Sequence, residues 1–582
     1  MSGAYYDKRP YVTVDADARL CFQGWRNIAD RLGHAAVLCV ECYPGVDVRE
    51  IEAALADRLR ARTVIRSGEA LRTPGEIDRL VHPFLTDDPV FGLMNDIHPE
   101  DVFDPARLGE LRTRAAQRMP GVTLVIGTGA ALIAPDADVL IYADLARWEI
   151  QQRHRRNEIG NFGADNCAEA PSQKYKRAFF IDWRIADQLK QRLLARIDYL
   201  LDTNVPGEPK MIAGNDFRRG LDIAARRPFR VVPFFDPGPW GGDWMMEKMD
   251  LSRDKPNYAW GFDCVPEENS LLLGFGERRV EIPSIDLVFY RPEELLGESV
   301  YRRFGAEFPI RFDFLDTMNG GNLSLQVHPL TSYIRRHFGM PYTQDESYYM
   351  LAAAPDASVY LGLKEGIDRE RMVGDLRAAQ QGGKSFAAEQ YVNRWPARKH
   401  DHFLIPGGTI HCSGRNSVVL EISATPYIFT FKLWDWDRLG LDGRPRPIHL
   451  EHGIANIQWD RTTDWVRRNL INRVEPISNN ACWREERTGL HPLEFIETRR
   501  HWFTSVTPHE TGGSVNVLNL VEGVEALIES PENGFEPFRV HYLETFIVPA
   551  SVGRYTVRPL GDVKNRKELA TVKASVRKES AG

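Results

Sequence analysis

Three features are scarce in this chain of 582 residues: closely spaced cysteines, long apolar runs and excess positive charge. No run reaches the roughly 18 apolar residues that a membrane span needs. The first stretch, MSGAYYDKRPYVTVDADARL, contains no apolar core typical of a signal peptide. These absences argue against a membrane or secreted protein, and we expect a cytoplasmic one.

The seven cysteines are scattered, and Cys39 and Cys42 are the only close pair. A cysteine-based zinc site usually needs a second pair at similar spacing, and a disulfide-rich secreted fold needs more cysteines per residue. We therefore expect free thiols in a reducing compartment.

The charge balance is acidic, with 74 Lys and Arg against 81 Asp and Glu, a net charge of -7 and a pI near 6.2. A general binder of nucleic acid or of anionic membranes carries the opposite excess. We therefore expect neither as a partner, while the sequence leaves a homo-oligomer open.

The length exceeds what one hydrophobic core can organise, because chains of this size divide into domains of about 150 residues. We expect three domains. An α/β domain spans residues 1–225, a β domain spans 226–470 with a helical insertion at 366–399, and a second β domain spans 471–582.

The first domain alternates strand-like and helix-like stretches. AAVLCVEC at 35–42, GVTLVIG at 121–127 and DADVLIYADL at 136–145 are short apolar runs typical of buried strands. VREIEAALADRLRAR at 48–62, RWEIQQRHRRN at 147–157 and ADQLKQRLLARIDYLL at 186–201 favour helices. Strands alternating with helices predict a parallel sheet covered by helices.

The phrase VECYPGVDVREI lies where a phosphate-binding loop would lie, between a strand and a helix. It lacks the glycines and the lysine of GxxxxGK[ST], since Val46, Asp47 and Val48 follow Gly45. The arginine-rich helix after DVLIYADL resembles the lid region of nucleoside kinases, and a solvated charged helix is the alternative explanation. We interpret the domain as a degenerate P-loop-kinase-like fold that serves regulation or assembly.

From residue 226 the chain is rich in proline, glycine, aromatics and short strand-like runs with turn signals, which predict two β jelly-roll barrels. The phrase FLIPGG in the first β block returns as FIVPAS in the second, which favours two copies of one barrel. The tail KNRKELATVKASVRKES is charged, and we expect it to fray.

Polar residues interrupt the apolar strands of the first β block in a regular way. In NLSLQVHPL, at 322–330, a strand would place Ser324, Gln326 and His328 on one face. DESYYMLAA then supplies Glu346, and HDHFLIPGGTIHCSG supplies His411. Imidazole, carboxylate and amide donors suit zinc or another divalent first-row metal. A single histidine in a strand is usually structural, so the order and spacing of all four groups together predict the metal site.

This arrangement resembles the class I (type I) mannose-6-phosphate isomerases, which are cupin proteins. The resemblance rests on PWGGDW, FPIRFDFLDT, LSLQVHP, DESYYML, IPGGTIHCSGRNSVVLEIS and FKLWDWDR, and it covers about 230–560. It implies zinc bound by Gln326, His328, Glu346 and His411. It also implies an active-site glutamate at Glu421 and a second β block that binds no metal, where His541 and Glu544 stand alone.

Three positions depart from the family pattern. Gln344 precedes Glu346 where the family has Lys-x-Glu, and Lys432 stands where the family has an arginine. The family lysine before FLDA corresponds to Asp313, although Arg311 lies on the same strand face. Fewer cations weaken the recognition of phosphate, since an anion needs paired positive charge or backbone donors.

The resemblance implies an aldose–ketose isomerase that converts mannose 6-phosphate and fructose 6-phosphate through an enediol-type intermediate. Lys432 and Glu421 would handle protons or stabilise that intermediate, and Arg438, Arg311 and Gln344 would contact the substrate. Two alternatives stay open: an isomerase of a different sugar, whether phosphorylated or not, and a non-catalytic sugar-binding regulatory cupin protein.

Overall fold

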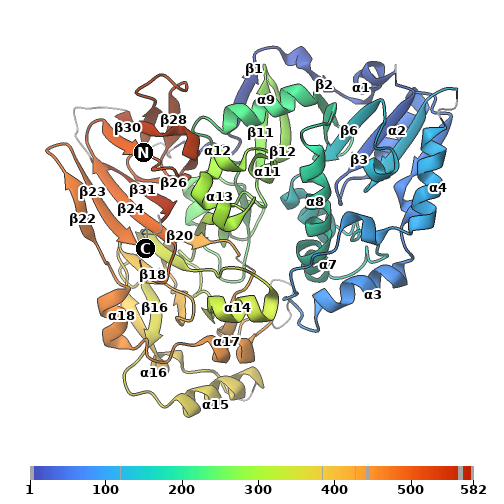
Figure 1. Cartoon of the computed structure of the whole chain (residues 1–582). Coiled ribbons are helices and arrows are strands. Elements are labelled where there is room, and N and C mark those ends of the chain that lie inside the picture. Colours follow the sequence, from blue (N-terminus) through green and yellow to red (C-terminus); the bar gives the residue numbers. More distant parts are fainter. Residues whose placement is uncertain are drawn as a thin grey trace. The chain divides into compact units, whose positions relative to one another are not determined.

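Figure 1 shows the computed structural model, which describes residues 5–33, 35–117, 120–382, 384–426, 428–440, 443, 446–489, 491–560 and 568–577. The chain divides into two compact units. The N-terminal unit comprises Pro10–Ala225 and Glu267–Arg291. The β unit comprises the residues before Pro10, the segment Arg226–Pro266 and the chain from Pro292 onward.

A hairpin from the middle of the chain joins the N-terminal unit, although we expected it in the first β domain. Its strands are β11 (Ser270–Phe275) and β12 (Arg278–Pro283), and β11 pairs in parallel with β1 (Tyr11–Asp15). The register places Tyr11 opposite Leu272. Such a pairing between segments far apart in the chain leaves no local sign in the sequence.

The N-terminal unit is built on a seven-stranded sheet with helices between its strands, as expected. The sheet order is β2-β8-β7-β6-β3-β5-β4, and the five strands from β7 to β4 are parallel. Its strands are β2 (Cys21–Gln23), β3 (Val37–Cys42), β4 (Thr63–Arg66), β5 (Thr123–Gly127), β6 (Val139–Asp144), β7 (Tyr199–Asp202) and β8 (Lys210–Ala213). The main helices are α1 (Trp25–Leu32), α2 (Val48–Arg58), α3 (Pro74–Leu85), α4 (Pro105–Ala116), α6 (Arg147–Arg155), α8 (Trp183–Leu193) and α9 (Gly214–Ala224).

The helix expected over 186–201 was wrong in its second half. Helix α8 ends at Leu193, and Tyr199–Asp202 forms strand β7 beside β6. Short apolar runs such as YLL are ambiguous between helix and strand, and here pairing with β6 on one side and β8 on the other decides in favour of the strand.

The loop between β3 and α2 satisfies its own helix terminus. The carboxylate of Asp47 accepts hydrogen bonds from the backbone N–H groups of Arg49 and Glu50, at 3.0 and 3.3 Å. These are the groups that a phosphate would need at a helix N-terminus. Asp47 therefore already occupies two N–H groups that a phosphate would use. This fits a loop whose sequence lacks the glycines and the lysine of a phosphate-binding loop.

The first β block is a sandwich of two antiparallel sheets. The six-stranded sheet has the order β18-β15-β20-β13-β10-β9, and the five-stranded sheet has the order β17-β16-β19-β14-β21. The strands of the first sheet are β9 (Phe234–Asp236), β10 (Trp260–Cys264), β13 (Ile310–Asp316), β15 (Glu346–Ala353), β18 (His402–Ile405) and β20 (Ser417–Ala424). Those of the second are β14 (Leu325–Val327), β16 (Ser358–Leu363), β17 (Val392–Pro396), β19 (His411–Ser413) and β21 (Phe431–Trp434).

Both sheets of this block end in edge strands, so within the described residues the expected closed barrel is not formed. The two-sheet arrangement is nevertheless the one that jelly rolls use. The insertion at 366–399 contains helices α15 (Arg369–Gln380) and α16 (Ala388–Tyr391), but its last part is strand β17. Helices α17 (Leu450–Asn456) and α18 (Thr463–Asn469) lead to the second block (Figure 1).

The second β block is another two-sheet sandwich. Its sheet orders are β22-β23-β24-β31-β26-β29 and β25-β30-β27-β28. The strands are β22 (Glu475–Asn479), β23 (Trp483–Gly489), β24 (Ile496–Phe503), β25 (Thr507–Glu510), β26 (Asn516–Glu522), β27 (Glu525–Glu529), β28 (Phe538–His541), β29 (Thr545–Val548), β30 (Arg554–Leu560) and β31 (Leu569–Val576). An apolar core that includes Phe503, Leu518, Phe546 and Val557 lies between the sheets.

The expectation that the C-terminal tail frays was wrong for Leu569–Val576. This segment is β31, which lies between β24 and β26 and is buried along most of its length. Its residues alternate between the two faces of the sheet, a pattern that the flanking charges of the tail obscured. Residues 564–567 and 578–580 of that tail lie outside the described residues.

We predict that Val572→Asp unfolds the second sandwich, because Val572 is 0% exposed in the interior of the sheet and an unpaired buried charge costs several kcal/mol. Val524→Asp, at a position 65% exposed, is the matched control and should leave stability within about 0.5 kcal/mol of the parent. Urea denaturation followed by circular dichroism measures both. A Val572→Asp protein as stable as the parent would show that β31 does not hold the sandwich together.

Candidate metal centre

Three side chains that can bind a metal converge between the two sheets of the first sandwich. Glu346 Oε2 lies 3.0 Å from His328 Nε2, and Glu346 Oε1 lies 2.8 Å from His411 Nε2. All three residues are buried, and their ligand atoms lie within 4.8 Å of one another. This is the one cluster of at least three such residues found in the described part of the chain.

The sheets position these groups from both sides. Gln326 on β14 is the direct cross-strand partner of His411 on β19, so their side chains share a face. Glu346 begins β15 of the other sheet, between Ile405 and Ser423. The sandwich therefore aims donors from two sheets at one point.

His328 does not lie within the strand that was expected to carry it, so strand alternation does not account for its position. Strand β14 covers only Leu325–Val327, so His328 and Ser324 lie just outside it. His328 still reaches Glu346, because the chain turns only after Pro329 into the helix that begins at Thr331. Ser324 instead donates a hydrogen bond to Gln326 Oε1 at 3.2 Å, which orients that amide.

Backbone carbonyl groups set the state of the imidazole rings. His411 Nδ1 lies 2.9 Å from the carbonyl oxygen of Thr409, and His328 Nδ1 lies 3.4 Å from that of Phe429. A carbonyl oxygen can only accept, so Nδ1 of each ring carries a proton and Nε2 is the atom turned toward Glu346. Two Nε2 atoms and a carboxylate that face one another at about 3 Å need positive charge among them, which protons on the rings or a bound metal ion can supply. The donor set therefore fits a bound divalent metal.

The electrostatics of Glu346 point the same way. Burial alone would raise its pKa, but His328 and His411 hold the pKa of this carboxyl well below its usual range. A carboxylate that stays ionised in a buried site is ready to bind a cation.

The two glutamine side chains lie at the edge of the cluster. Gln326 Nε2 is 3.3 Å from His411 Nε2, so the amide of Gln326 reaches the metal-binding face. Gln344 Nε2 donates to Glu346 Oε2 at 3.1 Å and to Glu421 Oε1 at 3.3 Å. Gln344 thus bridges the cluster and the glutamate that we expected to act in catalysis.

Glu421 lies in an acidic corner beside the cluster. It faces Asp313 across β13 and β20 and is 6% exposed. Burial is the main cause that raises its pKa well above the usual value, and Asp313 and Glu346 add to it. Arg311 lies 3.3 Å from Asp313 and 3.7 Å from Glu421, so its charge is already shared between two carboxylates.

Lys432 on β21 is a cross-strand partner of Gln326 and therefore shares the face of the cluster. Burial lowers its pKa to about 8, and the nearby cations Arg446 and Arg438 contribute. Such a lysine can exist as a neutral amine near neutral pH, which is the form able to accept a proton.

Arg438 is not brought to the cluster by any direct contact. Its guanidinium binds Asp435 at 2.6 Å, and Arg446 binds the other oxygen of Asp435 at 2.6 Å. The two arginines and one aspartate leave positive charge beside Lys432. Arg446 was not among the expected residues, because nothing local in the sequence links it to Asp435.

The pair His541 and Glu544 of the second block is engaged in structural contacts. His541 Nδ1 lies 3.1 Å from Glu544, and Glu544 also pairs with the buried Arg230 at 2.8 Å. Arg230 in turn bonds to Asp263, which ties the first block to the second. Both residues are thus engaged in contacts within the protein.

Two further observations concern the chain as a whole. All seven cysteines lie in the described part, and each is a free thiol. Among the described helices, none combines the length and the apolar character needed to cross a lipid bilayer.

Comparison with known proteins gives two results for different parts of the chain. Residues 24–226 match a family described as a domain of unknown function, DUF8485. This match gives no support to the kinase-like interpretation of the first domain, which stays a prediction.

The other relatives are sugar-phosphate isomerases by name. Mannose-6-phosphate isomerase of Streptococcus mutans is 25% identical over 217 residues, which are 37% of this chain and 63% of the relative. Mannose-6-phosphate isomerase ManA of Bacillus subtilis is 26% identical over 237 residues, 40% of this chain and 68% of the relative. The aligned part thus spans about two thirds of the length of these proteins or slightly less.

The solved structure of the mannose 6-phosphate isomerase from Bacillus subtilis aligns with 60% of this chain and 99% of its own, at 17% identity and a TM-score of 0.49. The chain is therefore similar in sequence to mannose-6-phosphate isomerases over about two fifths of its length, in addition to its match to DUF8485.

Proposed function

We propose that this protein is a metal-dependent aldose–ketose isomerase that interconverts mannose 6-phosphate and fructose 6-phosphate. The observation that carries the proposal is the buried His328, Glu346 and His411 cluster, flanked by one lysine and one glutamate with shifted pKa values. Relatives named mannose-6-phosphate isomerase support the substrate class. We also propose that both sandwiches are jelly rolls of the cupin type.

His328, Glu346, His411 and Gln326 would hold the metal, which we propose to be zinc because two imidazoles and a carboxylate are typical zinc ligands. A bound divalent cation supplies Lewis acidity toward the oxygens of a sugar. Burial of the cluster keeps water away, so the electrostatic effect of its charges is stronger than in solvent.

The isomerisation moves one proton between neighbouring carbons, and this chain offers two groups for it. Lys432 can take up a proton as a neutral amine, because its pKa is lowered to about 8. Burial and the neighbouring carboxylates raise the pKa of Glu421 well above its usual value, which favours the protonated form that can donate a proton to an oxygen. An acid and a base with pKa values moved toward neutrality suit an enediol-type reaction.

The phosphate would bind on the side of the site that carries positive charge. Arg438 and Arg446 share the single carboxylate of Asp435 there, next to Lys432. Arg311 and Gln344 would contact the sugar instead, since the charge of Arg311 is neutralised by Asp313 and Glu421.

One observation favours a second candidate, an isomerase of a non-phosphorylated sugar. Gln344 and Asp313 stand where related enzymes would carry lysines, and the side of the cluster that they line is neutral to acidic. Turnover assays with phosphorylated and free aldoses distinguish the two candidates.

We predict that His411→Ala removes metal binding and turnover together, because it takes away one of three convergent ligands. His402→Ala is the matched control, a buried histidine on β18 that belongs to no ligand cluster. Metal content after dialysis and a coupled isomerase assay measure both variants. Retention of one tightly bound metal per chain in His411→Ala would remove the basis of the site.

We predict that Lys432→Met keeps the metal but lowers kcat by about 100-fold or more, the usual range for loss of a general base. Methionine retains the length and the apolar stem of the side chain, so the packing of β21 should persist. Metal analysis and steady-state kinetics are the measurements. Unchanged kcat would exclude Lys432 from proton transfer.

We predict that Gln344→Lys raises kcat/KM for phosphorylated sugars, since it adds a cation beside Glu346 and Glu421. Gln344→Met, which adds no charge, is the control. No increase for mannose 6-phosphate relative to free mannose would contradict our account of how the site recognises its substrate.

A further inference from the structure

The interior of the second sandwich changes from apolar to charged along its length. On β24, Phe503 belongs to the apolar core, whereas the next residues on the same face are His501, Arg499 and Glu497. Inner-face positions normally carry apolar residues, because charged groups cost free energy when water is removed. One half of this interior is therefore built for something other than packing.

The neighbouring strands add polar groups at the same level. Glu485 on β23 is the cross-strand partner of His501, and Lys573 on β31 is the partner of Arg499. His501 Nε2 lies 3.2 Å from Glu485, and Arg499 binds Glu485 at 2.9 Å and also Glu497. Arg499 and His501 thus contact these two carboxylates directly, whereas Lys573 makes no such ion pair among the described residues.

The facing sheet contributes a histidine. His509 on β25 stacks on the ring of Tyr555 at a centroid distance of 5.1 Å, and its ring centroid lies 4.2 Å from that of His501. The hydroxyl of Tyr555 donates to Asn516 at 3.0 Å, which fixes the ring under the histidine. The stacked rings separate the apolar core from the polar half.

Two buried polar groups in this half have no partner within the described residues. His509 is 6% exposed and neither of its ring nitrogens makes a hydrogen bond. Lys573 is 7% exposed, and its ammonium makes no hydrogen bond or ion pair there, although Glu485 influences its charge. Burial lowers the pKa of Lys573 to about 8. Orphaned buried donors of this kind need a ligand or water to satisfy them.

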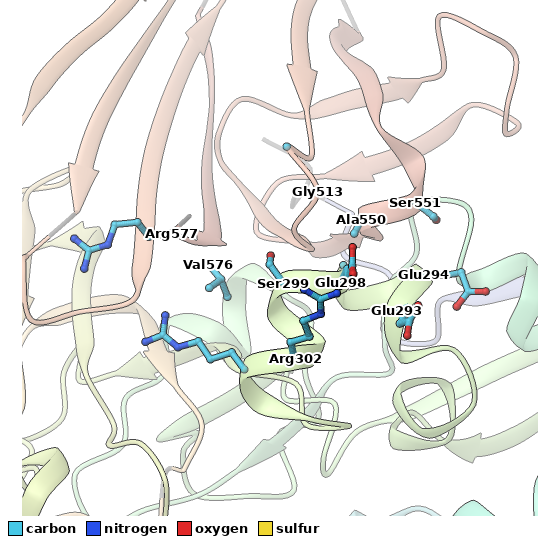
Figure 2. Close-up of a pocket in the computed structure, with 13 residues that line it drawn as sticks. Glu293, Glu294, Glu298, Ser299, Arg302, Gly513, Ala550, Ser551, Val576 and Arg577 are labelled. Atoms are coloured by element: carbon cyan, nitrogen blue, oxygen red, sulfur yellow. Dashed lines mark hydrogen bonds and ion pairs between the residues drawn. The ribbon is translucent and has the colours of Figure 1, made fainter. Parts of the chain in front are cut away.

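These groups line a cavity of about 580 Å³, a size suited to a small metabolite. The cavity shares Gly512, Val576 and Arg577 with a wider open groove of about 1100 Å³. Figure 2 shows that groove, where Ser299 and Arg302 of the helix α13 (Glu298–Phe304) face the loops that carry Gly513 and Ala550. A ligand could therefore enter from solvent at the end of the sandwich.

We propose that the polar half of the second sandwich is a binding site for a small hydroxylated organic anion, such as a sugar phosphate or a sugar acid, with Lys573 and His509 as its principal contacts. The oxyanion would pair with the ammonium of Lys573. The hydroxyl groups would bond to His509 and to the carboxylates of Glu485 and Glu497. The site does not depend on the proposed metal centre, since that centre lies between other strands.

The charges decide the class of ligand. The ammonium of Lys573 makes no ion pair with the described carboxylates that line the cavity, so an anionic group of a ligand can pair with it, whereas a large anion such as a nucleic acid would need an open cationic surface. Carboxylates beside the lysine would repel a compact anion without hydroxyl groups, but they are good acceptors for the hydroxyl groups of a polyol.

Isothermal titration of the full-length His411→Ala protein tests the proposal without interference from the metal centre. The probes are mannose 6-phosphate, gluconate, mannose and inorganic phosphate, each at millimolar concentration. We expect mannose 6-phosphate or gluconate to bind at one site per chain and at least 10-fold more tightly than mannose or phosphate. Which of the two binds distinguishes a phosphate from a carboxylate ligand.

Added to this background, Lys573→Met and His509→Phe should each weaken binding at least 10-fold, and Lys248→Met, a change at an exposed lysine, should not. Lys573→Met should also melt at the same temperature as its parent or higher, because it removes an unpaired buried charge. Equal binding by the Lys573→Met protein, or no binding of either organic anion by the parent, would overturn the proposal. A lower melting temperature with no binding would assign Lys573 a structural role.

Discussion

The proposed site depends on one constraint: two imidazole Nε2 atoms and a carboxylate, all buried, face one another at about 3 Å and need positive charge among them. Removing a carboxylate from water costs several kcal/mol, and the cost is repaid only by an opposite charge in good geometry. The backbone carbonyl of Thr409 fixes the proton of His411 on Nδ1 and so turns Nε2 toward the carboxylate. A cation at this point satisfies all three groups at once.

The sandwich makes such convergence possible. Side chains on the inner faces of two sheets approach one another, so Glu346 from one sheet and His411 from the other meet without any long loop. The same architecture recurs in the second sandwich, where His501 and His509 from facing sheets approach one another and Lys573 is the added cation. Both sandwiches thus hold polar groups between their sheets, but with different chemistry: two histidines around a carboxylate in the first, and a histidine and a lysine without direct partners among the described residues in the second.

Three of the four expected ligands, His328, Glu346 and His411, come together, and the signal for the expected set lies in interrupted patterns. Gln326, Glu346 and His411 interrupt runs that are otherwise apolar, and polar residues in a buried strand need a reason. The parallel sheet of the N-terminal unit was also predictable from its alternating apolar runs. Strand β31 was not, because Lys573 and the charged residues around it hid the alternation of Ala570, Val572 and Ala574. Pairings across long stretches of chain, such as that of β1 with β11, could not be derived from local pattern at all, and neither could the ion pair of Asp435 with Arg446. The carbonyl groups that orient the imidazoles belong to the backbone, and residue types carry no information about them.

The most direct test of the central claim is a crystal structure of the zinc-loaded protein with diffraction data collected on both sides of the zinc absorption edge. The account predicts an anomalous peak bonded to His328 Nε2, His411 Nε2 and a carboxylate oxygen of Glu346, at ordinary zinc distances of about 2.0–2.2 Å. Density without a metal at this point, with Glu346 protonated or turned away from the histidines, would contradict it.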